Sequence, residues 1–309
     1  MINRSISSAV VTGPTGAIGT ALCRELADHG IRVYAVCRPD SHRVQAVPRH
    51  KNISLVSCDV SQLQQLPDLI PQKVDAFFHF AWAHTIGAGR NDMTAQIQNI
   101  RCTVDAVRAA AALGCKIFLG AGSQAEYGRA EGMLQASTPC FPENGYGMAK
   151  LCAGHMSRTE AQRLELDHIW LRILSVYGPG DGPATMISSV ARTLIAGEEP
   201  ALTEGIQQWD YLYSGDAARA FLLAALHGVS GKVYPLGSGI ALPLKQYIQQ
   251  MRDAIDPTLS LGFGQIPYAP LQVMHLQADI SELTEDTGFV PDTDFARGIR
   301  ETIEWLRRS

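Results

Sequence analysis

Tyr146 and Lys150 stand four residues apart, in the segment Tyr-Gly-Met-Ala-Lys. Residues at this spacing share one face of a helix, so the phenol and the ammonium group can point into a single pocket. A free phenol titrates at about pH 10, and a fixed cation beside it favours the phenolate. The pair therefore predicts a group that exchanges a proton near neutral pH, as reduction of a carbonyl requires. The spacing is common by chance, so it gains weight only from other signals.

The first supporting signal is a glycine-rich turn near the N-terminus. An apolar run at 8–12 precedes Gly-Pro-Thr-Gly-Ala-Ile-Gly at 13–19, and a helical pattern follows. Glycines permit a tight turn and let the backbone approach a pyrophosphate, while a helix N-terminus offers free N–H groups. The spacing is GxxGxxG, where the commonest fingerprint is GxGxxG, but strand, turn and helix come in the required order. A dinucleotide site is therefore predicted, with cofactor contacts from Gly13, Thr15, Gly16, Ala17 and Ile18.

The second expected strand, 32–37, indicates which dinucleotide would bind. It ends without the acidic residue that holds a ribose 2′-hydroxyl, and Arg38 follows, with Ser41 and Arg43 close behind. A guanidinium suits a 2′-phosphate through charge-assisted hydrogen bonds. NADP(H) is therefore the expected cofactor, with NAD(H) as the alternative if Arg38 is only a solvated surface residue.

The rest of the chain alternates between apolar runs and helical patterns. Further strands are expected at 53–58, 76–80, 116–120, 168–174 and 233–236, and helices from Asn91 or Asp92 to Gly114, around Tyr146, at 216–226 and at 295–306. This order predicts an α/β fold, a Rossmann-like doubly wound parallel sheet with helices on both faces. Ligands then lie at the carboxyl ends of the strands. The cofactor residues expected there are Asp59, Val60, Ala81, Ala83 and Ile173.

Beyond Tyr177 the pattern becomes irregular and richer in glycine and proline. We expect residues 1–176 to form the dinucleotide-binding domain, completed by about 210–240. Segments 177–209 and 241–309 are expected to form a smaller substrate-binding subdomain. No linker or repeat marks a clean boundary between them.

The amino-acid composition limits which class of ligand and which cellular location are expected. Hydrophobic residues make up 46% of the 309, charged residues 18%, and the formal net charge is −4. Such a chain offers no basic footprint for nucleic acid, so a small molecule is the expected partner. Seven scattered cysteines without CxxC spacing are expected to be reduced and structural, with no metal site. The N-terminus lacks a signal-peptide pattern and no run reaches the ~20 apolar residues of a membrane span, so a cytoplasmic location is expected.

Taken together, these motifs resemble the extended short-chain dehydrogenase/reductase family. Residues 12–19 are similar to its TGxxGxxG motif, 146–150 to its YxxxK motif and 177–180 to its YGPG signature. Ser123, four residues before Tyr127-Gly128, matches the catalytic Ser/Thr position, and Asn99 matches the helix asparagine. The resemblance runs almost end to end, including 278–281 and 288–291. It implies a homodimer that pairs the Asn99 and Tyr146 helices.

Many relatives act on nucleotide sugars as epimerases, dehydratases or 4-keto reductases. Dehydratases carry an acidic pair after the catalytic Thr, where this chain has Gln124 and Ala125; Glu126 comes one position too late, which argues against dehydration. Where many relatives have an arginine that grips the substrate diphosphate, this chain has Trp209, which could stack on a base or sugar. The sequence looks most like bacterial reductases and epimerases of 6-deoxy nucleotide sugars.

The resemblance implies an NADPH-dependent ketoreductase of a nucleotide-linked 4-keto-6-deoxysugar. Tyr146 would protonate the carbonyl oxygen, Ser123 would hydrogen-bond it, Lys150 would lower the Tyr146 pKa and bind the nicotinamide ribose, and Asn99 would order a water. Substrate contacts are expected from His84, Gln124, Glu126, Ser175 and Trp209. The alternatives are a 4-epimerase with tightly bound NAD, a reductase of a non-sugar ketone, and a non-catalytic cofactor sensor. His79 is expected to be a packed core residue.

Overall fold

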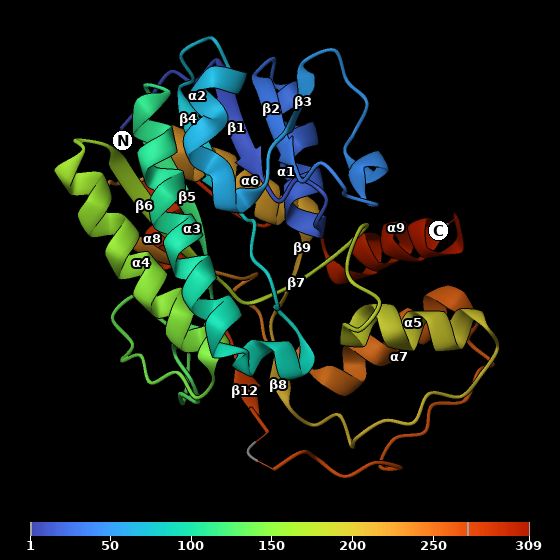
Figure 1. Cartoon of the computed structure of the whole chain (residues 1–309). Helices are drawn as coiled ribbons and strands as arrows, with labels where there is room; N and C mark the ends of the chain where they lie inside the picture. Colours follow the sequence, from blue (N-terminus) through green and yellow to red (C-terminus); the bar gives the residue numbers. More distant parts are fainter. Residues whose placement is uncertain (1, 271, 309) are drawn as a thin grey trace.

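A computed structural model describes residues 2–270 and 272–308, and its centre is a parallel sheet (Figure 1). The sheet has seven strands in the order β10-β6-β5-β4-β1-β2-β3, with every neighbouring pair parallel. The strands are β1 (Ser8–Thr12), β2 (Arg32–Cys37), β3 (Ile53–Ser57), β4 (Ala76–His79), β5 (Ile117–Ser123), β6 (Asp167–Ile173) and β10 (Val233–Leu236). The fold class expected from the sequence is confirmed.

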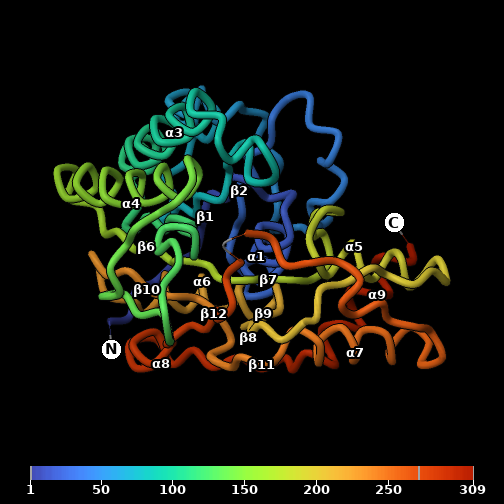
Figure 2. The backbone as a smooth tube through the Cα atoms, turned by 90° about the horizontal axis from the view of Figure 1, so that it is seen from below, coloured from blue at the N-terminus to red at the C-terminus, as the bar shows by residue number. Residues whose placement is uncertain are grey.

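Helices cover both faces of the sheet, because successive side chains of a strand point to opposite sides. Phe78 of β4 packs in the layer under α1 (Ala17–Asp28) and α6 (Ser214–His227). Its neighbour Phe77 packs in the layer under α3 (Met93–Ala112). Helix α4 (Gly145–Arg163) lies beside α3, and Figure 2 shows the pair on the side of the sheet opposite to α6 and α8 (Ser281–Thr287). Ligands are therefore expected at the carboxyl ends of the strands.

Short elements fill the connections between these strands and helices. They are η1 (Val44–Ala46), η2 (Val60–Gln65), α2 (Leu66–Leu69), η3 (Gly87–Asn91) and η4 (Gln124–Glu126). Helix α3 begins where the sequence predicts, because the Asp92 carboxylate accepts a hydrogen bond from Ala95 N at 3.1 Å and so caps the helix. All seven cysteines are unpaired thiols. In the described part of the chain, no helix combines the length and apolarity needed to cross a bilayer.

Strand β5 differs from the prediction, since it ends at Ser123 and not at Gly120. The glycines that looked like the end of the strand are there because the Trp170 ring of β6 lies across them. A Cβ atom added to Gly120 or Gly122 would overlap this indole. The extension places Ser123 at the last position of a buried strand, which fixes its backbone.

The remaining elements form a smaller lobe at the lower right of Figure 1. Its core packs α5 (Met186–Ile195), α7 (Leu244–Ile255) and α9 (Phe295–Arg308) together. A small sheet pairs β11 (Leu242–Pro243), β8 (Gln208–Trp209) and β12 (His275–Leu276), and β7 (Ser175–Tyr177) pairs with β9 (Tyr211–Tyr213). Helix α8 falls in the expected substrate range 241–309, yet Leu283 packs in the sheet core beside α6. The chain therefore returns to the sheet before it completes the lobe.

Candidate active site

The glycine turn sits against the end of β4. Gly13 has φ +70°, and an added Cβ would meet Ala81 N at 2.9 Å and Phe80 C at 3.0 Å. A Cβ at Gly19 would overlap Gly13 O, so the first turn of α1 packs directly on the loop. Gly16 is the N-cap of α1 and no side chain caps this end. The turn is thus a cradle of bare backbone that fits the diphosphate of a dinucleotide.

One of the basic residues after β2, Arg43, contacts this cradle. Arg43 Nη2 donates to Thr15 O at 2.6 Å and to Gly180 O at 3.2 Å, so it joins the glycine turn to the loop after β7. Arg38 is exposed, and its charge helps to lower the pKa of Asp59. The larger cause is Ser61, whose hydroxyl and N–H both donate to the Asp59 carboxylate, at 2.6 and 2.9 Å. Asp59 therefore caps η2, next to Val60.

The loop after β4 is held by Asn99 of α3. Asn99 Oδ1 accepts from Ala83 N at 3.0 Å, and its Nδ2 donates to Ala83 O at 2.9 Å. This pairing fixes the loop that carries Ala81 and His84, and His84 is exposed with φ +58°. Asn99 thus has a positioning role that the sequence did not predict, and its water-ordering role stays a prediction.

Ser123, Tyr146 and Lys150 meet where β5 ends against α4. Lys150 Nζ donates to Ala121 O at 2.7 Å and lies 3.7 Å from the centroid of the Trp82 ring. The same nitrogen is 5.8 Å from the Tyr146 ring centroid, and the Arg90 guanidinium is closer to that ring, at 4.6 Å. Helix α4 starts so that Tyr146 faces the strand, because Asn144 caps it through Gly147 N at 2.9 Å.

The pKa of Tyr146 differs from the expectation. Burial raises the pKa of Tyr146 above its ordinary value, while hydrogen bonding with Ser123 and the charge of Arg90 act in the opposite direction. In the chain by itself the pKa of Tyr146 is therefore raised, not lowered, and the effect of Lys150 on it stays a prediction. Burial also lowers the pKa of Lys150 to about 7, which the Glu126 carboxylate opposes. Near neutral pH the phenol keeps its proton, as an acid that protonates a carbonyl oxygen must.

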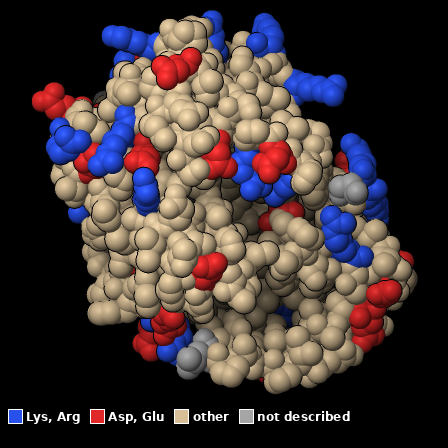
Figure 3. All heavy atoms as spheres, viewed as in Figure 1, with Lys and Arg blue, Asp and Glu red and all other residues tan. Residues whose placement is uncertain are grey.

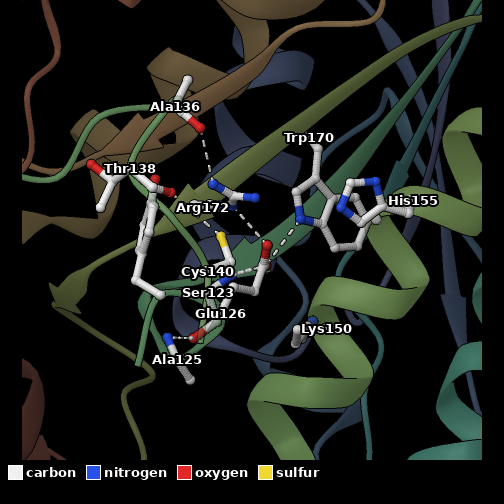
Figure 4. A network of polar contacts seen from close by, with 12 residues as sticks. Ser123, Ala125, Glu126, Ala136, Thr138, Cys140, Lys150, His155, Trp170 and Arg172 are labelled. Carbon is white, nitrogen blue, oxygen red and sulfur yellow. Dashed lines mark hydrogen bonds and ion pairs between the residues drawn. The ribbon is translucent and has the colours of Figure 1, made fainter. Parts of the chain in front are cut away.

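Glu126 corrects a second expectation, because it faces the interior. It is 1% exposed, and its Oε1 accepts from Ser123 N at 2.8 Å and Trp170 Nε1 at 3.0 Å (Figure 4). Its Oε2 accepts from Arg172 Nε at 2.8 Å. Both carboxylate oxygens have internal partners, so Glu126 has a structural role in place of the predicted substrate contact. One sequence feature could have indicated this internal position of Glu126, namely Arg172, a charged residue within the apolar run of β6 that requires a partner.

Two other expected substrate residues are joined at the entrance to the lobe. Trp209 Nε1 donates to Ser175 Oγ at 2.8 Å, which holds the half-buried indole at the junction of the sheet and the lobe. Gln124 follows Ser123 and is also half-buried, and Ile173 ends β6. Figure 3 shows a hollow between the sheet part and the lobe, on a face where positive and negative side chains alternate. His79 is buried as expected, with Nδ1 2.9 Å from Thr12 Oγ1, and burial lowers its pKa to about 3.

Comparison with known proteins identifies the class of the chain. The model of the NAD dependent epimerase/dehydratase family matches residues 9–237. The chain belongs to this family, whose members are NAD-dependent enzymes of the extended short-chain dehydrogenase/reductase type.

Individual relatives are distant. A dTDP-glucose 4,6-dehydratase of Streptomyces niveus is 26% identical over an alignment of 213 residues, and the match covers 63% of this chain and only 62% of the relative. A UDP-N-acetylglucosamine 4-epimerase structure from Methanobrevibacter ruminantium M1 has a TM-score of 0.88 at 23% identity and covers 99% of each chain. A structure of RMD from Pseudomonas aeruginosa complexed with NADPH has a TM-score of 0.79 at 21% identity, over 97% of this chain and 99% of the other. These structures share the fold.

Proposed function

We propose that the protein reduces the keto group of a nucleotide-linked 4-keto-6-deoxysugar with NADPH. The observation that carries this proposal is the meeting of Ser123, Tyr146 and Lys150 at the end of β5, with Tyr146 protonated near neutral pH. The bare glycine cradle that begins directly after β1 supports binding of the cofactor that the family uses. A nicotinamide cofactor, when bound, supplies the hydride.

The residues of the chain would divide the remaining work. Tyr146 gives its proton to the carbonyl oxygen as the hydride reaches the carbonyl carbon. The Ser123 hydroxyl donates a hydrogen bond to the same oxygen and stabilises the charge that develops there. Lys150, charged at or below about pH 7, would bind the nicotinamide ribose and favour the phenolate after transfer.

NADPH is preferred over NADH in this proposal, because the cationic Arg38 and Arg43 follow β2 where an acidic residue would favour NADH. Arg43 already bridges the glycine turn and the loop after β7, so a phosphate there would join an existing contact. The RMD structure complexed with NADPH is in line with this choice. Parallel titration with NADPH and NADH tests it. Arg38→Ala should weaken NADPH binding about tenfold and leave NADH binding unchanged; equal loss for both cofactors would contradict the assignment.

A nucleotide sugar is the proposed substrate because the family relatives that match the chain are named for such compounds. The Streptomyces niveus relative is a dehydratase, but Gln124 and Ala125 provide no acidic pair for dehydration here. The Trp209 ring, oriented by Ser175, offers a flat surface on which a base or a sugar can stack.

A 4-epimerase is the second candidate, favoured by the similarity to an epimerase structure over 99% of both chains. Both reactions use the same residues, so the state of the cofactor separates them. The absorbance spectrum of the purified protein distinguishes the two reactions, because stoichiometric bound NAD supports the epimerase. Protein without nucleotide that binds NADPH more tightly than NADH, and then oxidises it with a 4-keto sugar, supports the reductase.

We also propose that the protein is a homodimer through α3 and α4. Their outer faces expose apolar side chains at helical spacing, namely Met93 and Ile97 on α3 and Met148 and Met156 on α4. Ile97 is 67% exposed, and its burial against a partner would remove this apolar surface from water. Sedimentation equilibrium of the wild type and of Ile97→Lys tests this: the variant should be monomeric, and a monomeric wild type would overturn the assignment.

A further inference from the structure

The buried network behind Ser123 joins elements that carry all three proposed catalytic residues. Glu126 and Arg172 form an ion pair at 2.8 Å, with side chains that are 1% and 7% exposed. Arg172 also lies 4.7 Å from the Tyr127 ring centroid and donates to Ala136 O at 3.3 Å. Figure 4 shows the pair immediately behind Ser123, with Lys150 on the adjacent helix.

A buried ion pair is weak evidence for stability, because apolar residues of similar volume often serve as well. This pair supplies something that apolar residues could not, namely a charged acceptor with a fixed direction. Glu126 Oε1 accepts the Ser123 N–H and the Trp170 indole N–H together. Arg172 holds the other oxygen, so the carboxylate cannot turn away from Ser123.

The Trp170 ring sets the spacing between β5 and α4. It occupies a slot formed by three glycines, Gly120 and Gly122 on β5 and Gly154 on α4. A Cβ at Gly154 would come within 2.9 Å of the indole, and Cβ atoms at the two strand glycines would overlap it. Gly154 is one helical turn beyond Lys150 and two beyond Tyr146. The width of the indole therefore determines how far the phenol lies from the strand that ends in Ser123.

We propose that Glu126, Trp170 and Arg172 are positioning residues that fix Ser123 relative to Tyr146. The Glu126 carboxylate fixes the end of β5 by accepting the Ser123 N–H. It also accepts the Trp170 N–H, and the Trp170 ring sets the distance between α4 and β5. The kinetic test of this inference rests on the proposed function.

Two double variants distinguish the effect of the hydrogen-bond acceptor for Ser123 N from the effect of the charges on residues 126 and 172. Glu126→Leu/Arg172→Met removes both charges and the acceptor, whereas Glu126→Gln/Arg172→Met removes both charges and keeps an acceptor for Ser123 N. We expect the Leu variant to lose about tenfold to a hundredfold in kcat, with cofactor Kd changed less than about twofold. The Gln variant should keep most of the wild-type kcat. An unchanged kcat in the Leu variant, or equal losses in both, overturns the proposal.

A matched control lies at the other end of the same strand. Arg4 Nε donates to Asp167 Oδ2 at 2.9 Å, and Asp167 is the first residue of β6. Arg4→Met/Asp167→Asn should lower the melting temperature and leave kcat unchanged; a comparable kcat loss overturns the proposal. If the Leu variant does not fold, Trp170→Phe, which keeps the ion pair and the Ser123 contact, should lower kcat at constant cofactor Kd, and wild-type kcat would overturn the proposal.

Failure of the proposed function is distinguishable from failure of this inference. If the wild type turns over no nucleotide sugar, crystal structures of the wild type and the Gln and Leu variants give a readout without substrate. The proposal requires the separation between Ser123 Oγ and Tyr146 Oη to change in the Leu variant and to be kept in the Gln variant. An unchanged separation in the Leu variant overturns it.

Discussion

Glu126 in the sheet part and Asp210 in the lobe are both buried carboxylates, but their charges are compensated differently. Glu126 has one cation and two N–H donors, whereas Asp210 has neutral donors only. Asp210 Oδ1 accepts from Ser238 N and Oγ, both at 2.6 Å, and Oδ2 accepts from Gly239 N at 3.0 Å and Ala278 N at 3.1 Å. Burial raises the pKa of Asp210, and these hydrogen bonds oppose the shift.

The difference reflects what each region has to hold. The sheet part must fix one backbone group beside the reacting atoms, and a charged pair gives that acceptor a direction. The lobe must fasten segments that are far apart in sequence, since Asp210 joins the β8–β9 turn to the loops after β10 and β12. We therefore expect changes in the sheet part to alter kcat and changes in the lobe to alter stability or substrate affinity.

Tyr146→Phe is the strongest test of the sheet part. Loss of the proposed proton donor should lower kcat by about 10²–10⁴-fold and leave cofactor binding intact. The matched control is Tyr127→Phe, which removes a buried phenol that donates to Gln135 O at 2.9 Å, within a few residues of Ser123. Steady-state kinetics should show near-normal kcat for the control. Unchanged turnover in Tyr146→Phe would exclude this residue as the acid.

Asp210→Ala is the corresponding test of the lobe. Its removal leaves the buried Ala278 N–H and the half-buried N–H groups of Ser238 and Gly239 without an acceptor, so we expect a loss of about 3 kcal/mol in the free energy of unfolding. Asp256→Ala is the control, because Asp256 is exposed and accepts from Thr258 N and Oγ1 in the same local pattern. Urea denaturation should show a much smaller loss for the control. Equal losses would mean that the burial of Asp210 is unimportant.

The sequence predicted the sheet better than the lobe for a physical reason. Parallel strands buried on both faces are continuous apolar runs, so β1, β2 and β10 have the predicted bounds. The proposed catalytic residues Ser123, Tyr146 and Lys150 could be selected from the sequence because they occur in local motifs. The two-residue strands of the lobe have no sequence pattern of their own, because their pairing depends on segments that are distant in the sequence.

The contact between Ser123 and Glu126 was open to prediction, because Ser-Gln-Ala-Glu has the spacing of a capping box. The contact between Glu126 and Arg172 was not, because the two residues are 46 positions apart: a charged residue in an apolar strand requires a partner, but nothing local indicates which one. Gly120 and Gly122 suggested that β5 ends near residue 120. They are in fact part of the strand, and the Trp170 ring occupies the space that their side chains would need. Burial likewise decides the pKa of Tyr146, and burial is a property of the fold.

The pH dependence of stability tests the burial of Lys150. Its pKa is about 7 in the folded chain and ordinarily 10.5, so between these values the unfolded chain binds the extra proton. The free energy of unfolding should therefore rise with pH in this window, by about 2 kcal/mol from pH 7 to pH 9 relative to Lys150→Met, in which the titrating group is absent. Urea denaturation of both proteins at the two pH values measures this difference. Parallel pH profiles would show that Lys150 is solvated.

Trp209→Ala tests the role of the residue at the boundary between the sheet part and the lobe. If the indole only stacks on the substrate, its loss should raise KM about tenfold and leave kcat almost unchanged, because the contact is present equally in the ground and transition states. Ser175→Ala is the graded control: it removes the 2.8 Å hydrogen bond that orients the ring but keeps the stacking surface, so its effect on KM should be smaller. A fall in kcat at constant KM in Trp209→Ala would assign Trp209 to the reacting centre, and the lobe would then share the chemistry that we place on the sheet.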